Sequence, residues 1–325
     1  MPNARERFRD VQNAELRPLG AGELLDRAVT IFVRQFVPIV VVIAVTLVPV
    51  TILEALANPH AGSTFNDMMT VLTSAGGSAA SRHAAEQLGL SNRAGFLTFL
   101  IVFLAMIVRL VMWSAIVSVV AAAYAGSRVT IAQAYRIGLA RWFAQAVVGL
   151  AFVIIGTVAL IPVFIAYILV VFAVVALAAL HLTVITVIVG VVFGLIVILA
   201  AIILSSWIFM TYELASVAVV TEQANPISAI SLALSRGLAP GMKRRTIIGG
   251  LVVFVVSEVG TLPIVGLGIL ASATTHVDAL YFAIVGAGSV LLEGLVAAFV
   301  IVFAVDVRTR REGLDLIADT PPVVV

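Results

Sequence analysis

Residues 144–178 read AQAVVGLAFVIIGTVALIPVFIAYILVVFAVVALA, and the apolar sequence continues to residue 220 with His181 and Glu213 as its only acidic or basic residues. A transmembrane helix needs about 20 apolar residues, so this stretch has room for two long spans or four short ones. Four spans would leave almost no residues for the turns between them. The sequence therefore favours two spans, over 144–178 and 183–220, that turn near His181.

The composition of the whole chain agrees with a membrane protein. Of its 325 residues, 62% are hydrophobic and 11% are charged, whereas soluble domains carry about 25% charged residues. We therefore expect an all-α, polytopic helical membrane protein with a single transmembrane domain over residues 19–305. Four further apolar stretches bring the expected spans to six: 36–57, 95–125, 247–271 and 280–305.

The arginines and lysines predict how the chain crosses the membrane. Cytoplasmic loops of membrane proteins are enriched in these residues. With both termini inside, 16 of the 19 lie in the inner segments and two, Arg82 and Arg93, lie in the loop 58–94. We therefore expect a multi-pass protein of the inner (cytoplasmic) membrane, with 58–94 as an external loop. Residues 1–18 then form a cytoplasmic arm and 306–325 a cytoplasmic tail.

A proline-marked phrase occurs three times: VPVTILEAL at 48–56, IPVFIAYIL at 161–169 and LPIVGLGIL at 262–270. Its prolines, Pro49, Pro162 and Pro263, fall in the first, third and fifth expected spans. A proline inside a helix removes one backbone hydrogen bond and kinks the helix. Two interpretations stay open: the three kinks frame a central cavity, or each helix bends only to fit its neighbours.

A short amphipathic segment precedes each of these spans. In the first segment four polar residues share one helical face and five apolar residues lie opposite: Glu23, Arg27, Thr30 and Arg34 against Leu25, Ala28, Val29, Phe32 and Phe36. In the second, Thr130 is the expected cap, and an apolar arc faces Gln133 and Arg136: Ile131, Tyr135, Leu139 and Trp142. In the third, Asn225 is the expected cap before Pro226, and the apolar stripe is Ile227, Ile230, Leu234 and Leu238.

Short basic helices on the cytoplasmic side are typical of segments that lie in the plane of the membrane surface. The repeating unit is then an in-plane helix followed by a transmembrane hairpin. We expect three pseudo-repeats, over about 19–125, 129–220 and 226–305. The arginines of the in-plane helices are expected to contact anionic lipid head groups; they are Arg27, Arg34, Arg136, Arg141 and Arg236.

Three charged residues fall near the middle of expected spans: Arg109, Glu258 and Glu293. An unpaired charge there costs at least about 2.5–3.5 kcal/mol, so the three are expected to face the bundle interior and pair. They form either a buried salt bridge that fixes helix register, or a polar pocket or ion-coupled site. Glu54 and Asp306, at the ends of spans, are expected to be solvated.

Residues typical of catalysis are missing from the sequence. The chain has no cysteine, its four histidines show no metal-binding spacing, and it contains no HExxH, P-loop or GxSxG motif. We therefore expect no enzyme activity and no cofactor. A formal charge of +2 gives no reason to expect a nucleic-acid partner.

Residues 16–28 read LRPLGAGELLDRA, and Glu222, Pro226, Ala229 and Arg236 follow the fourth span. Both features resemble the bacterial family named for the membrane domain of glycerophosphoryl diester phosphodiesterases. The chain departs from the family at 231–233, where Ser-Leu-Ala stands in place of an arginine pair and a serine. Only 19 residues follow Asp306, which leaves no room for the soluble phosphodiesterase barrel. The resemblance therefore implies no phosphodiesterase activity.

The expected function is that of a non-catalytic scaffold or accessory subunit that binds membrane lipid, in particular anionic lipid, or a membrane protein partner. The alternative is an ion- or proton-coupled transporter of small molecules that uses Arg109, Glu258 and Glu293. Transporter repeats are commonly inverted, whereas the three repeats expected here all begin on the same side. A membrane-embedded lipid enzyme is the third and least favoured function, because the sequence shows no nucleophile or metal constellation that such an enzyme would need.

Overall fold

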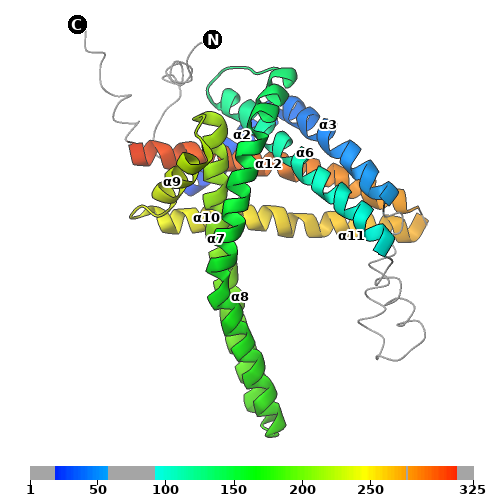
Figure 1. Cartoon of the computed structure of the whole chain (residues 1–325), viewed down its shortest axis with the longest axis vertical. Coiled ribbons are helices and arrows are strands. Elements are labelled where there is room, and N and C mark those ends of the chain that lie inside the picture. Colours follow the sequence, from blue (N-terminus) through cyan, green and yellow to red (C-terminus); the bar gives the residue numbers. More distant parts are fainter. Residues whose placement is uncertain (1–18, 58–91, 276, 313–325) are drawn as a thin grey trace. The chain divides into compact units, whose positions relative to one another are not determined.

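The computed structural model of the chain (Figure 1) describes residues 19–57, 92–275 and 277–312. Most of the expected external loop, 58–94, lies outside these ranges, as do the N-terminal arm and most of the C-terminal tail. The described residues are helical and contain no strand, which confirms the all-α prediction. The helices are α2 (Ala21–Arg34), α3 (Phe36–Ala57), α6 (Asn92–Tyr124), α7 (Ile131–Ala179), α8 (Thr183–Thr221), α9 (Pro226–Gly237), α10 (Met242–Phe254), the π-helix η2 (Val255–Val259), α11 (Gly260–Thr275) and α12 (Asp278–Glu312).

Within the described ranges, six helical segments are long and apolar enough to cross a membrane. They are Phe36–Leu53, Phe103–Tyr124, Ile131–Ala179, Thr183–Thr221, Met242–Thr275 and Ala279–Arg311. The structure therefore has as many candidate spans as the sequence predicted. The apolar stretch 144–220 forms two long helices rather than four short ones, with a turn at His181, whose φ is 57°.

The second expected in-plane helix is not a separate helix. α7 runs unbroken through 49 residues, from Ile131 to Ala179, so the amphipathic segment and the span are continuous. At about 1.5 Å per residue the helix is about 73 Å long, more than twice the hydrocarbon thickness of a bilayer. No proline or turn interrupts the sequence between the two segments. Thr130 caps the helix as predicted, because its hydroxyl accepts a bond from Gln133 N–H and the Gln133 side chain accepts one from Thr130 N–H.

The described helices fall into two compact units. Of the described residues, the first unit contains 19–20, Phe143–Phe254 and 300–312, and the second contains 21–57, 92–142, 255–275 and 277–299. Each unit therefore joins parts of the chain that are far apart in sequence. The single transmembrane domain expected over 19–305 stays a prediction.

In the first unit, α8 packs against α7, α9 and α10, and Figure 1 shows α7 and α8 side by side as a hairpin. The Gln145 amide donates a hydrogen bond to the Ser216 carbonyl at 2.9 Å. α8 and α10 approach so closely that a Cβ on Gly250 would lie 2.0 Å from the Ser206 carbonyl oxygen. Towards the turn at His181 both helices of the hairpin expose apolar side chains on most faces, as lipid-facing helices do.

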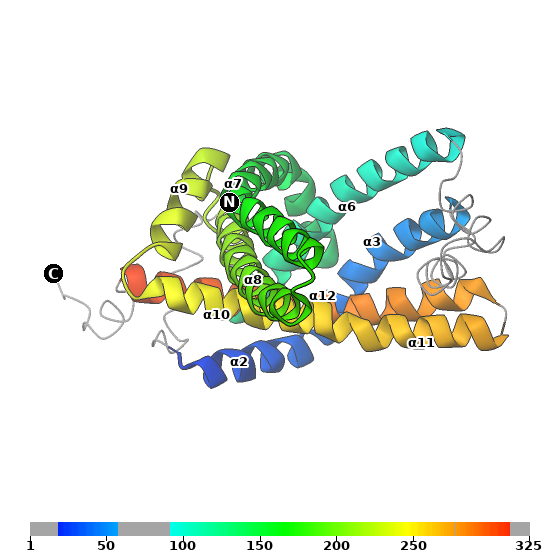
Figure 2. The same ribbon diagram turned by 90° about the horizontal axis from the view of Figure 1, so that it is seen from below.

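In the second unit, α3 packs on α6, and α2 contacts both. The Tyr135 hydroxyl donates to the Val42 carbonyl at 2.5 Å and lies 2.6 Å from the Thr46 hydroxyl, which ties the start of α7 to α3. α11 lies beside α12 (Figure 2), where a Cβ on Gly288 would meet Ile264 at 2.4 Å. Small residues therefore allow the close helix contacts in both units.

Pro49, Pro162 and Pro263 all lie inside helices, in α3, α7 and α11. Pro263 is preceded by the π-helical turn η2. Proline has no N–H, so Pro263 cannot bond the carbonyl of Val259 four residues earlier, at the end of that turn. The helix continues through the defect instead of ending there. Both interpretations of the three prolines, a central cavity or bends that fit each helix to its neighbours, stay predictions.

Candidate functional site

The three mid-span charges all belong to the second unit. Arg109 is on α6, Glu258 in η2 and Glu293 on α12. Among the residues it describes, the structure records no direct ion pair of Arg109 or Glu293. Gly260 would meet Leu292 at 3.2 Å if it carried a Cβ, so the end of η2 lies at the level of Glu293.

The burial of these residues differs from the expectation. Glu293 is half-buried, whereas the Arg109 and Glu258 side chains are exposed. The prediction that all three face the interior is therefore wrong for Arg109 and Glu258. For Glu258 the reason lies in the π-helical turn, because its wider spacing shifts side chains out of the 3.6-residue register used to place them. The choice between a salt bridge and an ion-coupled site stays open.

α2 presents three different sides. Leu24 and Ala28 are buried against the second unit. The Arg27 guanidinium lies over the ring of Tyr124 on α6, 4.7 Å from its centroid, which is a cation–π contact. Arg34 is exposed on the polar side. A third side carries an exposed apolar stripe of Leu25, Val29 and Val33, and Phe36 at the start of α3 is also exposed.

α9 is the corresponding short helix of the first unit. The Asn225 side chain accepts a hydrogen bond from Ser228 N–H at 2.8 Å, and Pro226 begins the helix, which confirms the predicted cap. Ala229 and Ala233 are buried, on a helix that packs on α8. Of the predicted apolar stripe, Ile227 is 81% and Leu238 44% exposed, whereas Ile230 and Leu234 are half-buried. The helix thus packs through small residues and exposes only the two ends of the predicted stripe.

Arg236 does not have the role expected for it. Its side chain is buried and forms a double hydrogen bond with Glu222, with Nη1–Oε1 at 2.6 Å and Nη2–Oε2 at 3.0 Å. Glu222 caps the C-terminal end of α8, so the pair holds α9 against α8. The prediction that Arg236 contacts a lipid head group is therefore wrong, because its guanidinium is bound to Glu222 inside the protein. The pair was missed because the chain reverses between its members, where Gln223 has a φ of 53°.

The other arginines expected at head groups differ in exposure. Arg34 and Arg136 are exposed, whereas Arg141 is half-buried. Arg136 and Arg141 belong to the continuous helix α7. Contact of Arg27, Arg34, Arg136 and Arg141 with lipid stays a prediction.

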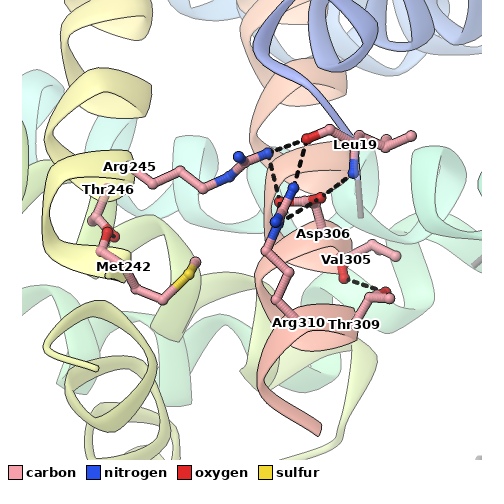
Figure 3. Close-up of polar contacts among 8 residues, drawn as sticks. All are labelled: Leu19, Met242, Arg245, Thr246, Val305, Asp306, Thr309 and Arg310. Atoms are coloured by element: carbon pink, nitrogen blue, oxygen red, sulfur yellow. Dashed lines mark hydrogen bonds and ion pairs between the residues drawn. The ribbon is translucent and has the colours of Figure 1, made fainter. Parts of the chain in front are cut away.

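Asp306 is the centre of a buried polar network in the first unit (Figure 3). Its side chain is 0% exposed, so the expectation that it is solvated is wrong. Arg245 Nη2 lies 2.9 Å from Oδ2, and Arg310 Nε lies 3.2 and 3.1 Å from the two carboxylate oxygens. The reason is that α12 continues past the expected end of the span at residue 305, which carries Asp306 into the packed part of the unit.

The same network holds the backbone of Leu19. The Leu19 N–H donates to Asp306 Oδ1 at 2.7 Å. The Leu19 carbonyl accepts hydrogen bonds from Arg245 Nη2 at 2.5 Å and Arg310 Nη2 at 2.8 Å. Both polar groups of one peptide residue are therefore bound by a carboxylate and two guanidinium groups. The spacing of Asp306 and Arg310, four residues apart on a helix, was the signal in the sequence that could have revealed part of this network.

Glu213 on α8 is a second buried charge that sequence reasoning passed over. It is 5% exposed, and its Oε2 atom has no hydrogen-bond partner in the structure. Gln145 on α7 is fully buried and its Oε1 atom is also without a partner. Within the described part of the chain, no three histidine or acidic side chains come together as metal ligands would. The described polar clusters are therefore ionic and hydrogen-bonding in character.

No protein-family model, curated protein or solved structure matches this chain. The resemblance to the phosphodiesterase membrane domain stays a prediction. Several residues on which it rests do have defined places: Leu19 in the Asp306 network, Pro226 at the start of α9, and Glu222 with Arg236 between α8 and α9.

Proposed function

We propose that this chain is a non-catalytic membrane scaffold that binds anionic lipid. The proposal rests on the surfaces of α2 and α9. α2 packs one side on its own unit, exposes a stripe of apolar residues and adds the exposed Arg34. α9 packs on its unit through Ala229 and Ala233 and exposes Ile227. A helix with these sides is stable at the membrane surface, with the stripe among acyl chains and the cation among head groups.

The pseudo-repeat belongs to this proposal. Two of its three expected units begin with a separate short helix, α2 before α3 and α9 before α10. The middle unit begins with the first turns of α7, where the same role falls to Arg136 and Arg141. A proline inside the odd-numbered spans supports the division into 19–125, 129–220 and 226–305. A distant kinship with the phosphodiesterase membrane domain is part of the same proposal.

The proposed location is the inner membrane of a bacterium, with both termini in the cytoplasm. The distribution of arginine and lysine supports it, since 16 of 19 fall on the side of the termini. In this orientation α2 and α9 lie on the cytoplasmic leaflet. Anionic lipids give that surface a negative potential that attracts cations.

An ion-coupled transporter is the second candidate, and one observation favours it. Glu258 sits in a π-helical turn, a defect that is frequent at functional sites. Exposed charges at this depth need water or a partner. Uptake assays in proteoliposomes with wild type and Glu258→Gln separate this candidate from a scaffold.

The experiment that tests the scaffold uses native mass spectrometry of the full chain released from nanodiscs that hold phosphatidylcholine and phosphatidylglycerol. Removing the exposed helix cations with Arg34→Gln and Arg136→Gln is expected to reduce the number of retained phosphatidylglycerol molecules. Arg128→Gln is the matched control, because Arg128 is exposed and on the same predicted side but lies between helices. Equal retention in all three proteins contradicts the proposal.

A further inference from the structure

α10 begins with an unusual charge pattern. Lys243, Arg244 and Arg245 occupy its first turn, which contains no acidic residue. The N-terminal end of a helix carries a partial positive charge from its free N–H groups, so acidic residues are favoured there and cations are not. Three cations at this position are therefore unfavourable unless negative charge lies nearby.

The Asp306 network brings a second group of cations to the same place. Arg245 from α10 and Arg310 from α12 bind one carboxylate and the same carbonyl oxygen of Leu19. Figure 3 shows the two guanidinium groups converging from the two helices. The first turn of α10 and the last turns of α12 are therefore neighbours within the first unit. We name Lys243, Arg244, Arg245, Arg310 and Arg311 the basic end.

The described negative charge does not balance the basic end. Asp306 is fully buried and is bound by Arg245, Arg310 and the Leu19 N–H. Its single negative charge offsets one of the two positive charges of Arg245 and Arg310, and Lys243, Arg244 and Arg311 are exposed. Arg245 itself retains a buried Nε–H without a hydrogen-bond partner. Even with Glu312, which follows Arg311 at the end of α12, five cations stand against two carboxylates.

The location of the basic end points to the chemistry of its ligand. It lies where the span Met242–Thr275 begins and the span Ala279–Arg311 ends, which is the level of the lipid head groups. Arginine forms paired hydrogen bonds with phosphate oxygens, and lysine adds a point charge. Basic clusters between spans on the cytoplasmic side bind phosphate-bearing head groups.

We infer that the basic end is a binding site for a phosphate group, carried by the head group of an anionic phospholipid. The Asp306 network holds α10 and α12 together, and the exposed cations Lys243, Arg244 and Arg311 supply the charge for the phosphate. This inference rests on the proposed lipid-binding function and gives it one defined site, separate from the surfaces of α2 and α9.

The test compares three variants of the full chain in nanodiscs with phosphatidylglycerol and phosphatidylcholine. The site variant carries Lys243→Gln, Arg244→Gln and Arg311→Gln, which spare the Asp306 network. The helix variant carries Arg34→Gln and Arg136→Gln. A charge-preserving variant, Lys243→Arg with Arg244→Lys and Arg311→Lys, shows whether charge at these positions is sufficient.

Each cation near an anionic surface contributes a factor of about five in binding, so losing three weakens phosphatidylglycerol binding about a hundredfold. We expect this loss in the site variant, with retention of the tightest lipid in the helix variant and in the charge-preserving variant. Phosphatidylglycerol binding of the site variant equal to wild type overturns the inference. The helix variant distinguishes this inference from the proposed function. If only the helix variant loses phosphatidylglycerol binding, the proposed function is supported and the basic-end site is contradicted.

Inorganic phosphate distinguishes the two sources of the ligand. A lipid that stays bound in millimolar phosphate identifies the head group of a phospholipid. Phosphate that binds the wild type in the absence of lipid, and not the site variant, upholds a phosphate site but overturns the lipid as its occupant. The melting temperature of each variant checks that the compared proteins are folded. It should equal that of the wild type, because the substituted side chains are exposed.

Discussion

The carboxylate of Asp306 accepts a hydrogen bond from the backbone N–H of Leu19 at 2.7 Å, across 287 residues of chain. Leu19 stands two residues before α2, and Asp306 lies near the end of α12. Within the first unit, the contact therefore joins the residue just before α2 to the end of α12. Arg245 and Arg310 complete it by binding the Leu19 carbonyl.

Asp306→Asn is expected to destabilise the protein strongly. Removing one partner of a buried ion pair leaves uncompensated charge and costs about 3–5 kcal/mol. We expect the lower end of that range, because the Arg245 and Arg310 side chains are 24% and 30% exposed. Thermal unfolding in detergent measures the loss. Asp26→Asn, at an exposed aspartate on α2, is the matched control and should melt like wild type; equal melting of both variants contradicts the network's role.

The pair of Arg236 and Glu222 should show strong energetic coupling. Either single change, Arg236→Gln or Glu222→Gln, breaks a buried double hydrogen bond and is expected to lower stability. The double variant should lose less than the sum of the two, with an interaction energy of about 1–3 kcal/mol. A double-mutant cycle on unfolding measures it. Additive effects would mean that the two side chains do not stabilise one another.

Gly250→Ala should be poorly tolerated, because the new Cβ would lie 2.0 Å from the Ser206 carbonyl oxygen and force α10 away from α8. Gly194→Ala on α8 is the control, since nothing lies within 4 Å of its Cβ position. Alanine is favoured over glycine in a helix by about 0.5–1 kcal/mol, so the control should melt at or above the wild-type temperature. Comparable melting of the two variants would contradict the close packing of α8 and α10.

Glu213→Gln is expected to preserve or raise stability. Glu213 is buried, and one of its carboxylate oxygens has no hydrogen-bond partner, so a charge there is costly. Glutamine keeps the shape and removes the charge. The melting temperature in detergent is the measurement, and Glu213→Asp, which keeps a carboxylate but shortens the side chain, is the comparison. A marked fall for Gln but not for Asp would show that the carboxylate itself is required.

The predicted orientation can be tested with single cysteines, because the chain has none of its own. Ser127 is exposed between α6 and α7, on the predicted cytoplasmic side, and Ser63 lies in the predicted external loop. A membrane-impermeant maleimide should label Ser63→Cys in cells whose inner membrane is intact, and Ser127→Cys only after that membrane is opened. The reverse pattern would invert the topology.

The spans could be predicted from the sequence because the membrane sets their length. The apolar stretch 144–220 could be recognised as two helices from its length alone, without knowing which other segment packs against it. The caps at Thr130 and Asn225 were also predictable, since each depends on a bond within three residues. Local rules of this kind apply before any tertiary contact is known.

The ion networks could not be predicted in the same way. Asp306 is close to a span end in sequence, but its burial depends on Leu19 and Arg245, which lie far away in the chain. Arg236 has the sequence pattern of a surface cation, yet Glu222 reaches it only because the backbone reverses at Gln223. Helical periodicity places side chains around one helix and carries no information on which other segment packs against it.

The most direct test of lipid binding is the lipid retained by the unmodified protein. The full chain would be reconstituted in nanodiscs that contain equal amounts of phosphatidylcholine and phosphatidylglycerol, then released and weighed by native mass spectrometry. If the protein is an anionic-lipid scaffold, the retained lipids should be strongly enriched in phosphatidylglycerol. Retained lipid in the same equal proportion as the nanodisc would contradict the proposed function.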